Sequence, residues 1–253
     1  MRIGVRSKGF FKIGDDQCVV LDHARLHGEN YSGRKLLQFA SIGSHLHACN
    51  FDNTRIESAA FGSGRETSEY VECTFNGARM DMGPGGFSRF VRCSFQNIRI
   101  RDWTCFAVEM IDCTFSGRLE TAIFNGTVPE DDRAMIGRAS NEFHGNDFSA
   151  MDLIDVAFRT GIDLTKQVLP SGEDYLYLPH AALAVSRAKS RVAGWNDEKL
   201  RRGATPIIQS LEYALLGGQQ QLLLRLSNYY GVSSIPREAV DCVLALLRES
   251  AGA

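Results

Sequence analysis

Histidine and cysteine side chains in the first half of the chain are the ones best suited to chemistry. His45, His47 and Cys49 stand at alternate positions, and imidazole and thiolate groups are ligands that zinc accepts. Cysteine then recurs at wide intervals in a set of four: Cys49, Cys73, Cys93 and Cys113. Such a set is compatible with metal binding or with redox chemistry, so its place in the fold decides what it does.

The four cysteines mark a repeat, because a phenylalanine follows each of them two positions later. These phenylalanines are Phe51, Phe75, Phe95 and Phe115. The last three copies are 20 residues apart, and the first lies 24 residues upstream of the second. Within each repeat a large residue recurs at every fifth position, with a small or apolar residue two positions before it. A period of five fits neither an α-helix nor a flat strand, but it fits a chain that turns a corner every five residues and completes a coil in four sides.

This register indicates how the candidate ligands point. Leu46 and Cys49 face inward, whereas His45 and His47 face outward, so a shared metal ion is not expected. Each cysteine fills a slot that alanine would fill, as a small apolar thiol. The cysteine and phenylalanine sets are therefore predicted to form a structural core column. No nucleophile and base stand at an informative spacing, so we expect no enzyme, no metal and no cofactor.

The repeat resembles the pentapeptide-repeat family over residues 19–164. A stretch close to the family's repeat unit is Asn146-Asp147-Phe148-Ser149-Ala150-Met151-Asp152-Leu153. The resemblance is to an actinobacterial-type member with a helical extension at its C-terminus, and it implies a right-handed quadrilateral β-helix. We expect residues 1–18 to cap one end. Two breaks interrupt the period: residues 62–68 suit a bulge or loop, and residues 125–140 suit a surface loop that is either functional or a tolerated insertion.

A small α-helical region is predicted for residues 170–253, after the five-residue step ends at Leu164. A first helix opens at Pro179, and a second has Asn196 as its N-cap and is broken or restarted at Pro206. A third runs from Gln219 to Tyr230, and Pro236 opens the last. The fold class is thus mainly β with a helical C-terminal region, which caps the solenoid, forms a homodimer or recruits a partner.

The outward positions carry ordered charge. Arg55, Arg79 and Arg99 each follow a core phenylalanine by four positions, so they would stack as like charges. Either acidic neighbours compensate for them or an anionic partner binds there, and compensation is the favoured reading. Three positions before the phenylalanines stand Glu72, Arg92 and Asp112, an alternating ladder. The possible interaction face combines the three stacked arginines with the acidic triplet Glu130, Asp131 and Asp132.

Composition excludes several classes of protein. The chain has 253 residues and a net charge of −2, which argues against a basic protein that binds nucleic acid directly. No apolar run is long enough to span a membrane, and no secretory signal is expected. Seven cysteines without paired spacing suggest reduced thiols in a cytoplasmic protein.

Three functions stay open at this point. The first is a non-enzymatic protein-interaction scaffold with an unknown protein partner. The second is implied by the family resemblance alone: a DNA mimic that modulates or protects a type II topoisomerase such as gyrase, although the near-neutral charge and the three arginines depart from that pattern. The third is a ligand-binding or enzymatic site where the two regions meet, with the candidate residues Asp174, Tyr175, Tyr177 and His180.

Overall fold

The computed structural model describes residues 17–83, 85–232 and 234–251. The chain divides into two compact units. The solenoid unit runs up to Val156 and includes Thr165–Leu169, and the helical unit comprises Ala157–Leu164 and Pro170–Ala253. The predicted N-terminal cap lies outside the described residues, apart from its last two positions, and the second of these, Cys18, already belongs to a strand.

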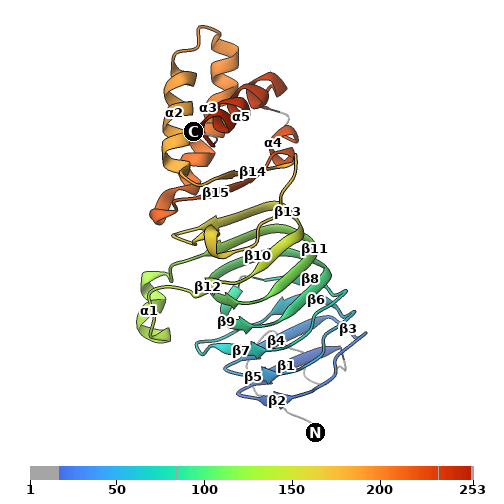
Figure 1. Cartoon of the computed structure of the whole chain (residues 1–253). Coiled ribbons are helices and arrows are strands. Elements are labelled where there is room, and N and C mark those ends of the chain that lie inside the picture. Colours follow the sequence, from blue (N-terminus) through green and yellow to red (C-terminus); the bar gives the residue numbers. More distant parts are fainter. Residues whose placement is uncertain (1–16, 84, 233, 252–253) are drawn as a thin grey trace. The chain divides into compact units, whose positions relative to one another are not determined.

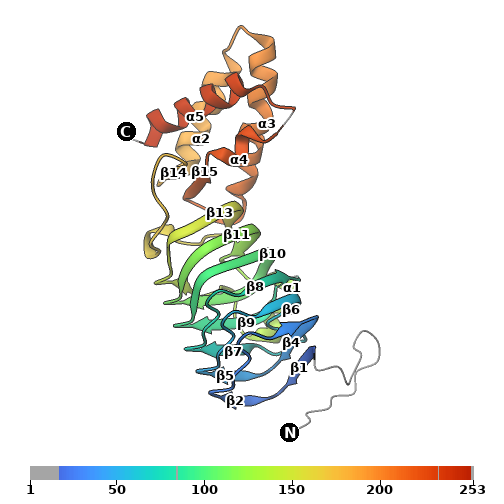
Figure 2. The same ribbon diagram turned by 90° about the vertical axis from the view of Figure 1, so that its right-hand side faces the viewer.

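Strands in the solenoid unit follow one another around successive coils, and each pairs in parallel with its equivalent one coil away (Figure 1). Figure 2 shows two such rows, one of β1, β4, β6 and β8 and one of β2, β5, β7 and β9. This is the right-handed quadrilateral β-helix that the sequence predicts. The strands are β1 Cys18–Asp22, β2 Arg25–His27, β3 Lys35–Leu36, β4 Gln38–Ile42, β5 His45–His47, β6 Arg55–Ala60, β7 Ser68–Val71, β8 Arg79–Met82, β9 Gly85–Val91, β10 Ser94–Ile111, β11 Thr114–Asn125, β12 Phe143–His144 and β13 Asp147–Arg159.

Corners form where the chain takes up a left-handed backbone conformation. Glu72, Arg92 and Asp112 have φ values of 54°, 50° and 53° and lie at equivalent positions on successive coils. Side chains other than glycine are strained in this region. The strain is offset by the coil-to-coil ladder, since the N–H of Glu72 donates to Val91 and the N–H of Arg92 donates to Ile111.

Aromatic rings stack along the interior of the solenoid unit. The distances between ring centroids are 4.9 Å from Phe51 to Phe75, 4.6 Å from Phe75 to Phe95 and 4.8 Å from Phe95 to Phe115, with ring planes within 8° of parallel. The predicted column is confirmed, and it continues to Tyr31 at one end and Phe148 at the other. The four cysteines of the repeat are buried next to it. The interior is therefore filled by the chain's own side chains.

The first break in the period is a loop between β6 and β7, as predicted. It holds a close approach of two glycines, because a Cβ built on Gly86 would lie 1.7 Å from the carbonyl oxygen of Gly62. Only glycine fits at that position.

For the second break, residues 125–140, the prediction of a plain surface loop is wrong, because the segment contains the helix α1 (Glu130–Ile136). Three acidic residues occupy its first turn, where the helix dipole favours negative charge. Gly137 ends the helix at a φ of 72°, and its N–H donates to the carbonyl of Arg133. Two backbone hydrogen bonds close the base of the segment, from Val128 to Ala139 and from Asn141 to Gly126.

The helical unit packs its longer helices around one apolar core and adds a two-stranded antiparallel sheet. Its helices are α2 (Ala181–Ala193), α3 (Glu198–Ala214), α4 (Ser227–Tyr230) and α5 (Arg237–Ala251), and its sheet pairs β14 (Tyr175–Leu178) with β15 (Leu222–Arg225). Two short 3-10 helices, η1 and η2, span Leu164–Lys166 and Leu216–Gly218.

Three predictions for this region are wrong. The second helix starts with Asp197 as its N-cap, one residue later than predicted, and the Asp197 side chain accepts from the N–H of Leu200 at 2.9 Å. Pro206 lies inside α3 without breaking it, because Ala204, Ile207 and Ile208 beside it are buried in the core. Packing there outweighs the hydrogen bond that proline cannot donate.

The predicted helix from Gln219 to Tyr230 is instead β15 followed by the single turn α4. The leucines at 222, 224 and 226 are buried at alternate positions, which is the period of a strand. The side chain of Gln219 fixes the entry, since its Oε1 accepts from Gly161 and Ile162 and its Nε2 donates to the carbonyl of Ile162.

Replacing Phe95 in the middle of the ring column with alanine is expected to lower the free energy of unfolding by about 3–5 kcal/mol, because the coils above and below cannot close the cavity. Chemical denaturation measures the change. The matched control is Phe106→Ala, whose ring is 45% exposed and whose loss is expected to cost less than about 1 kcal/mol. Equal losses in the two variants would contradict the stacked core.

Candidate interaction surface

Parallel pairing in register places equivalent side chains of successive coils about 4.8 Å apart. On one wall this brings five cations into a single line across β3, β6, β8, β10 and β11. Lys35 pairs with Arg55, Arg55 with Arg79, Arg79 with Arg99, and Arg99 with Arg118. All five side chains are exposed. We call them the cationic column.

The predicted arginines thus do lie together, and two further residues extend them. Lys35 follows Tyr31 by four positions, the same offset as in the other coils, so the sequence signal was present. Arg118 follows Phe115 by only three, because the register shifts by one residue between Phe95 and Ile98. Because of that shift, Arg118 does not stand at the position that the repeat predicts.

Counter-charges cover one end of the cationic column. An oxygen of Glu120 lies 3.3 Å from Arg99 and 3.6 Å from Arg118, and Asp152 lies 3.3 Å from Arg118. Among the residues that the structure describes, no carboxylate lies within the 4.0 Å of an ion pair from Lys35, Arg55 or Arg79. The predicted compensation thus takes the form of an ion pair at Arg99, whereas Arg55 and Arg79 form no ion pair among the described residues.

The carboxylate next to the column is already engaged. Asp81 forms two hydrogen bonds with Arg101, of 2.9 and 2.6 Å. These bonds, and then the charges of Arg101, Arg55 and Arg99, hold the pKa of Asp81 below its ordinary value. Asp81 therefore stays ionised, and its direct ion pair is with Arg101 and not with a member of the column.

A hollow of about 260 Å³ adjoins the uncompensated end. Leu37 gives it an apolar side, with 45% of that residue exposed. The residues that line it are Gln17, Lys35, Leu36, Leu37, Arg55 and Glu57. The hollow thus includes two cations of the column, and Leu37 adds an exposed apolar side chain to an otherwise mostly polar lining.

On a different wall, charges of opposite sign lie over one another and form ion pairs. Arg89 lies 3.6 Å from Glu69, 2.9 Å from Glu109 and 2.7 Å from Glu142. Glu109 is buried and has a second cation, Arg138, at 3.3 Å. Charges alternate along this line, so it is a stabilising element.

The predicted ladder of Glu72, Arg92 and Asp112 forms only in part. Arg92 donates twice to Glu72, at 2.9 and 3.0 Å, and His47 lies 3.4 Å from the same carboxylate. Within the described residues Asp112 takes part in no ion pair. Both side chains of the Glu72–Arg92 pair are about half exposed, so the pair contributes little stability.

The acidic triplet Glu130, Asp131 and Asp132 does not share a wall with the cationic column. It lies in α1, on the opposite side of Figure 1 from β3, β6 and β8. Arg138 fastens this segment by donating to the carbonyl of Ala107 at 2.9 Å. The predicted face is therefore two separate surfaces.

The histidine and cysteine motifs form no ligand cluster in the part of the chain that the structure describes. His45 and His47 point outward, each toward a carboxylate, and Cys49 is buried. Burial raises the pKa of the Cys93 and Cys105 thiols. All seven cysteines are free, and five of them are buried.

The four candidates near the start of the helical unit do not meet in one cavity. Asp174 accepts from the N–H and hydroxyl of Ser227 and so holds the start of α4. Asp174 and Tyr175 line a hollow of about 630 Å³, and neither Tyr177 nor His180 does. Tyr177 carries a buried hydroxyl without a hydrogen-bond partner, and His180 stands at the N-cap of α2 without a side-chain bond to the helix.

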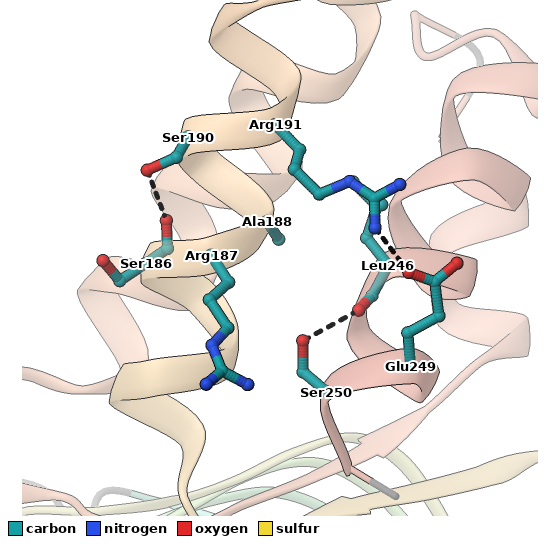
Figure 3. A pocket seen from close by; sticks show the side chains of 8 residues that line it. All are labelled: Ser186, Arg187, Ala188, Ser190, Arg191, Leu246, Glu249 and Ser250. Atoms are coloured by element: carbon teal, nitrogen blue, oxygen red, sulfur yellow. Dashed lines mark hydrogen bonds and ion pairs between the residues drawn. The ribbon is translucent and has the colours of Figure 1, made fainter. Parts of the chain in front are cut away.

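A further hollow of about 430 Å³ lies between α2 and α5 (Figure 3). Arg191 pairs across it with Glu249, while Ser190 and Ser250 donate to carbonyls of their own helices. Most of its polar groups are used within the helical unit, which leaves a ligand mainly Arg187 and the hydroxyl of Ser186. None of the helices in the described residues is long and apolar enough to cross a membrane.

The register and the ring column define the class of protein, a β-solenoid with five-residue sides. No protein-family model matches the chain, and no curated protein matches it. Solved structures of QnrB1, described as a plasmid-mediated fluoroquinolone resistance protein, do match. A trypsin-treated variant is 14% identical with a TM-score of 0.19 over 60% of this chain and 78% of that one. The full-length form is 13% identical with a TM-score of 0.16 over 59% and 81%. Similarity this low carries no argument about this chain, and the fold assignment rests on the geometry above.

Replacing Arg79 with glutamate is expected to raise the free energy of unfolding by up to about 1 kcal/mol, because like charges directly opposite one another are destabilising. The gain should shrink in about 0.5 M salt as the charges are screened. Arg65→Glu, an exposed loop change off the column, is the control in the same urea titrations. A loss of stability in Arg79→Glu that exceeds the control would show that the column is compensated after all.

Thiol reactivity tests the interior assignment. Half-buried Cys18 and Cys242 are expected to react with a disulfide reagent at about pH 8, while the five buried thiols react only after unfolding. The raised pKa of Cys93 and Cys105 keeps them protonated in the folded state over this pH range. Stopped-flow absorbance counts the fast thiols, and the double variant Cys18→Ser/Cys242→Ser should lose the fast phase. Rapid reaction of a column cysteine would be inconsistent with the packed core.

Proposed function

We propose that the chain is a non-enzymatic protein-interaction scaffold of the pentapeptide-repeat type, and that it receives its partner on the wall of the cationic column. The observation that carries the proposal is the line of three cations, Lys35, Arg55 and Arg79, without a carboxylate within 4.0 Å among the described residues. Stacked like charges destabilise a sheet, and an anionic partner removes that cost.

The packing of the solenoid unit supports this proposal. Its interior rings are buried, with Phe51 and Phe75 fully inaccessible to solvent. A filled interior leaves the outer walls as the surfaces available for binding. Those walls are held by backbone hydrogen bonds between coils, so they present side chains at fixed backbone spacing and the backbone loses little entropy on binding.

The cytoplasm is the compartment we propose for this activity. All seven cysteines are free in the structure, and free thiols persist in reducing compartments.

The family resemblance supplies the alternative, modulation or protection of gyrase by a wall that imitates DNA. Such imitation needs columns of carboxylates. The wall described here carries five cations in register and only interspersed carboxylates, so the scaffold is the better supported function.

The test is affinity capture from a lysate of the source organism with quantitative mass spectrometry. The bait variants are Arg55→Glu/Arg79→Glu on the column and Arg25→Glu/Arg65→Glu off it, which change the net charge equally and replace exposed residues. A protein retained by the wild type and the control, and reduced at least about tenfold by the column variant, is the expected result.

Retention that is equal for all three baits would contradict the proposed wall. A supercoiling assay with purified gyrase runs beside the capture. If micromolar protein inhibits or protects gyrase, and the Arg55→Glu/Arg79→Glu variant does so equally, the function is assigned to the alternative.

A further inference from the structure

We infer that the uncompensated end of the cationic column binds one extended acidic segment of a polypeptide, with an apolar side chain of that segment seated beside Leu37. The inference rests on the proposed function and names the chemistry of the partner. Its support comes from the width, the spacing and the apolar neighbour of the column.

The width of the cationic column favours a single extended chain as the ligand. The column is one side chain wide, and the neighbouring outward position carries Asp81 and Glu120 on either side of Arg101. Glu57 adds a carboxylate at the rim of the hollow. A nucleic-acid duplex, with two rows of phosphates, would approach these carboxylates, whereas one extended chain can stay over the cations.

Spacing fits a polypeptide in strand conformation. Coils about 4.8 Å apart place Lys35 and Arg79 about 10 Å from each other at the backbone. In an extended peptide, side chains on the same side recur at about 6.6 Å. Two carboxylates of such a peptide therefore lie within the length of the three cations, and each guanidinium can hold a carboxylate through two parallel hydrogen bonds.

The surface beside the cationic column favours a peptide over single-stranded nucleic acid as the ligand. Proteins that hold single strands stack the bases on exposed aromatic rings. The exposed aromatic residues of the described chain are Phe106, Tyr213 and Tyr230, and none of them lies on β3, β6 or β8. What adjoins Lys35 and Arg55 is a hollow of about 260 Å³ with Leu37 at its side. That volume suits an aliphatic side chain.

The experiment measures fluorescence anisotropy with a labelled synthetic peptide of alternating glutamate and threonine and a leucine at each end. We expect saturable binding to the full chain that weakens at least about tenfold in Arg55→Glu/Arg79→Glu and in about 0.5 M salt. Arg25→Glu/Arg65→Glu should bind as the wild type does, and circular dichroism checks that both variants are folded. Leu37→Ser should weaken the leucine peptide and leave a version with terminal serines unchanged.

Three results would overturn the inference. They are binding of the peptide that is indifferent to the column reversal, no saturable binding at millimolar peptide, and preferential binding of a thymidine oligonucleotide of equal charge through the same arginines. A partner captured through the column, together with any of these results, would leave the proposed function standing and reject only the acidic peptide. If the affinity capture finds no partner that depends on the column, the proposed function itself is rejected.

Discussion

Parallel hydrogen bonding between successive coils forces each residue to lie over its equivalent in the next coil. Inside the solenoid unit this rule is favourable, because ring lies on ring at 4.6–4.9 Å from Phe51 to Phe115. Outside, the same rule brings like charge onto like charge wherever the repeat places a cation. The core and the cationic column are therefore two consequences of one register.

Two lines of charge show three outcomes of that constraint. Along Glu69, Arg89 and Glu109 the sign alternates, so stacking stabilises the wall. At Arg99 and Arg118 the column is neutralised from the side by Glu120. Across Lys35, Arg55 and Arg79 neither remedy is present among the described residues. A protein tolerates a local loss of stability where the groups concerned serve binding, and this contrast within one wall distinguishes the uncompensated end from ordinary surface charge.

The sequence predicted the solenoid well because its determinants are local and repeated. Phe75, Phe95 and Phe115 stand 20 residues apart, and each coil repeats the same pattern. The errors lie where long-range packing decides. The pattern around Leu222 and Leu224 predicts a helix, but this segment pairs with β14 in the fold and so forms the strand β15. Pro206 stays helical because Ala204 and Ile207 beside it are buried in the core of the helical unit. For the site, Arg55, Arg79 and Arg99 followed from the repeat, whereas Arg118 is displaced by a one-residue shift in the pairing of β10 with β11.

Carboxylates beside the column give it selectivity at the expense of attraction. With a net charge of −2 the chain exerts no strong long-range pull on polyanions, and fields from exposed groups fade within about 8–10 Å at physiological salt. Recognition then depends on short contacts at fixed positions. Asp81, held ionised by Arg101, and Glu120 repel a broad anionic surface but leave a strip one residue wide. A ligand must therefore be narrow, extended and acidic to reach Arg55 and Arg79, and the exposed side chain of Leu37 favours one that also carries an aliphatic side chain.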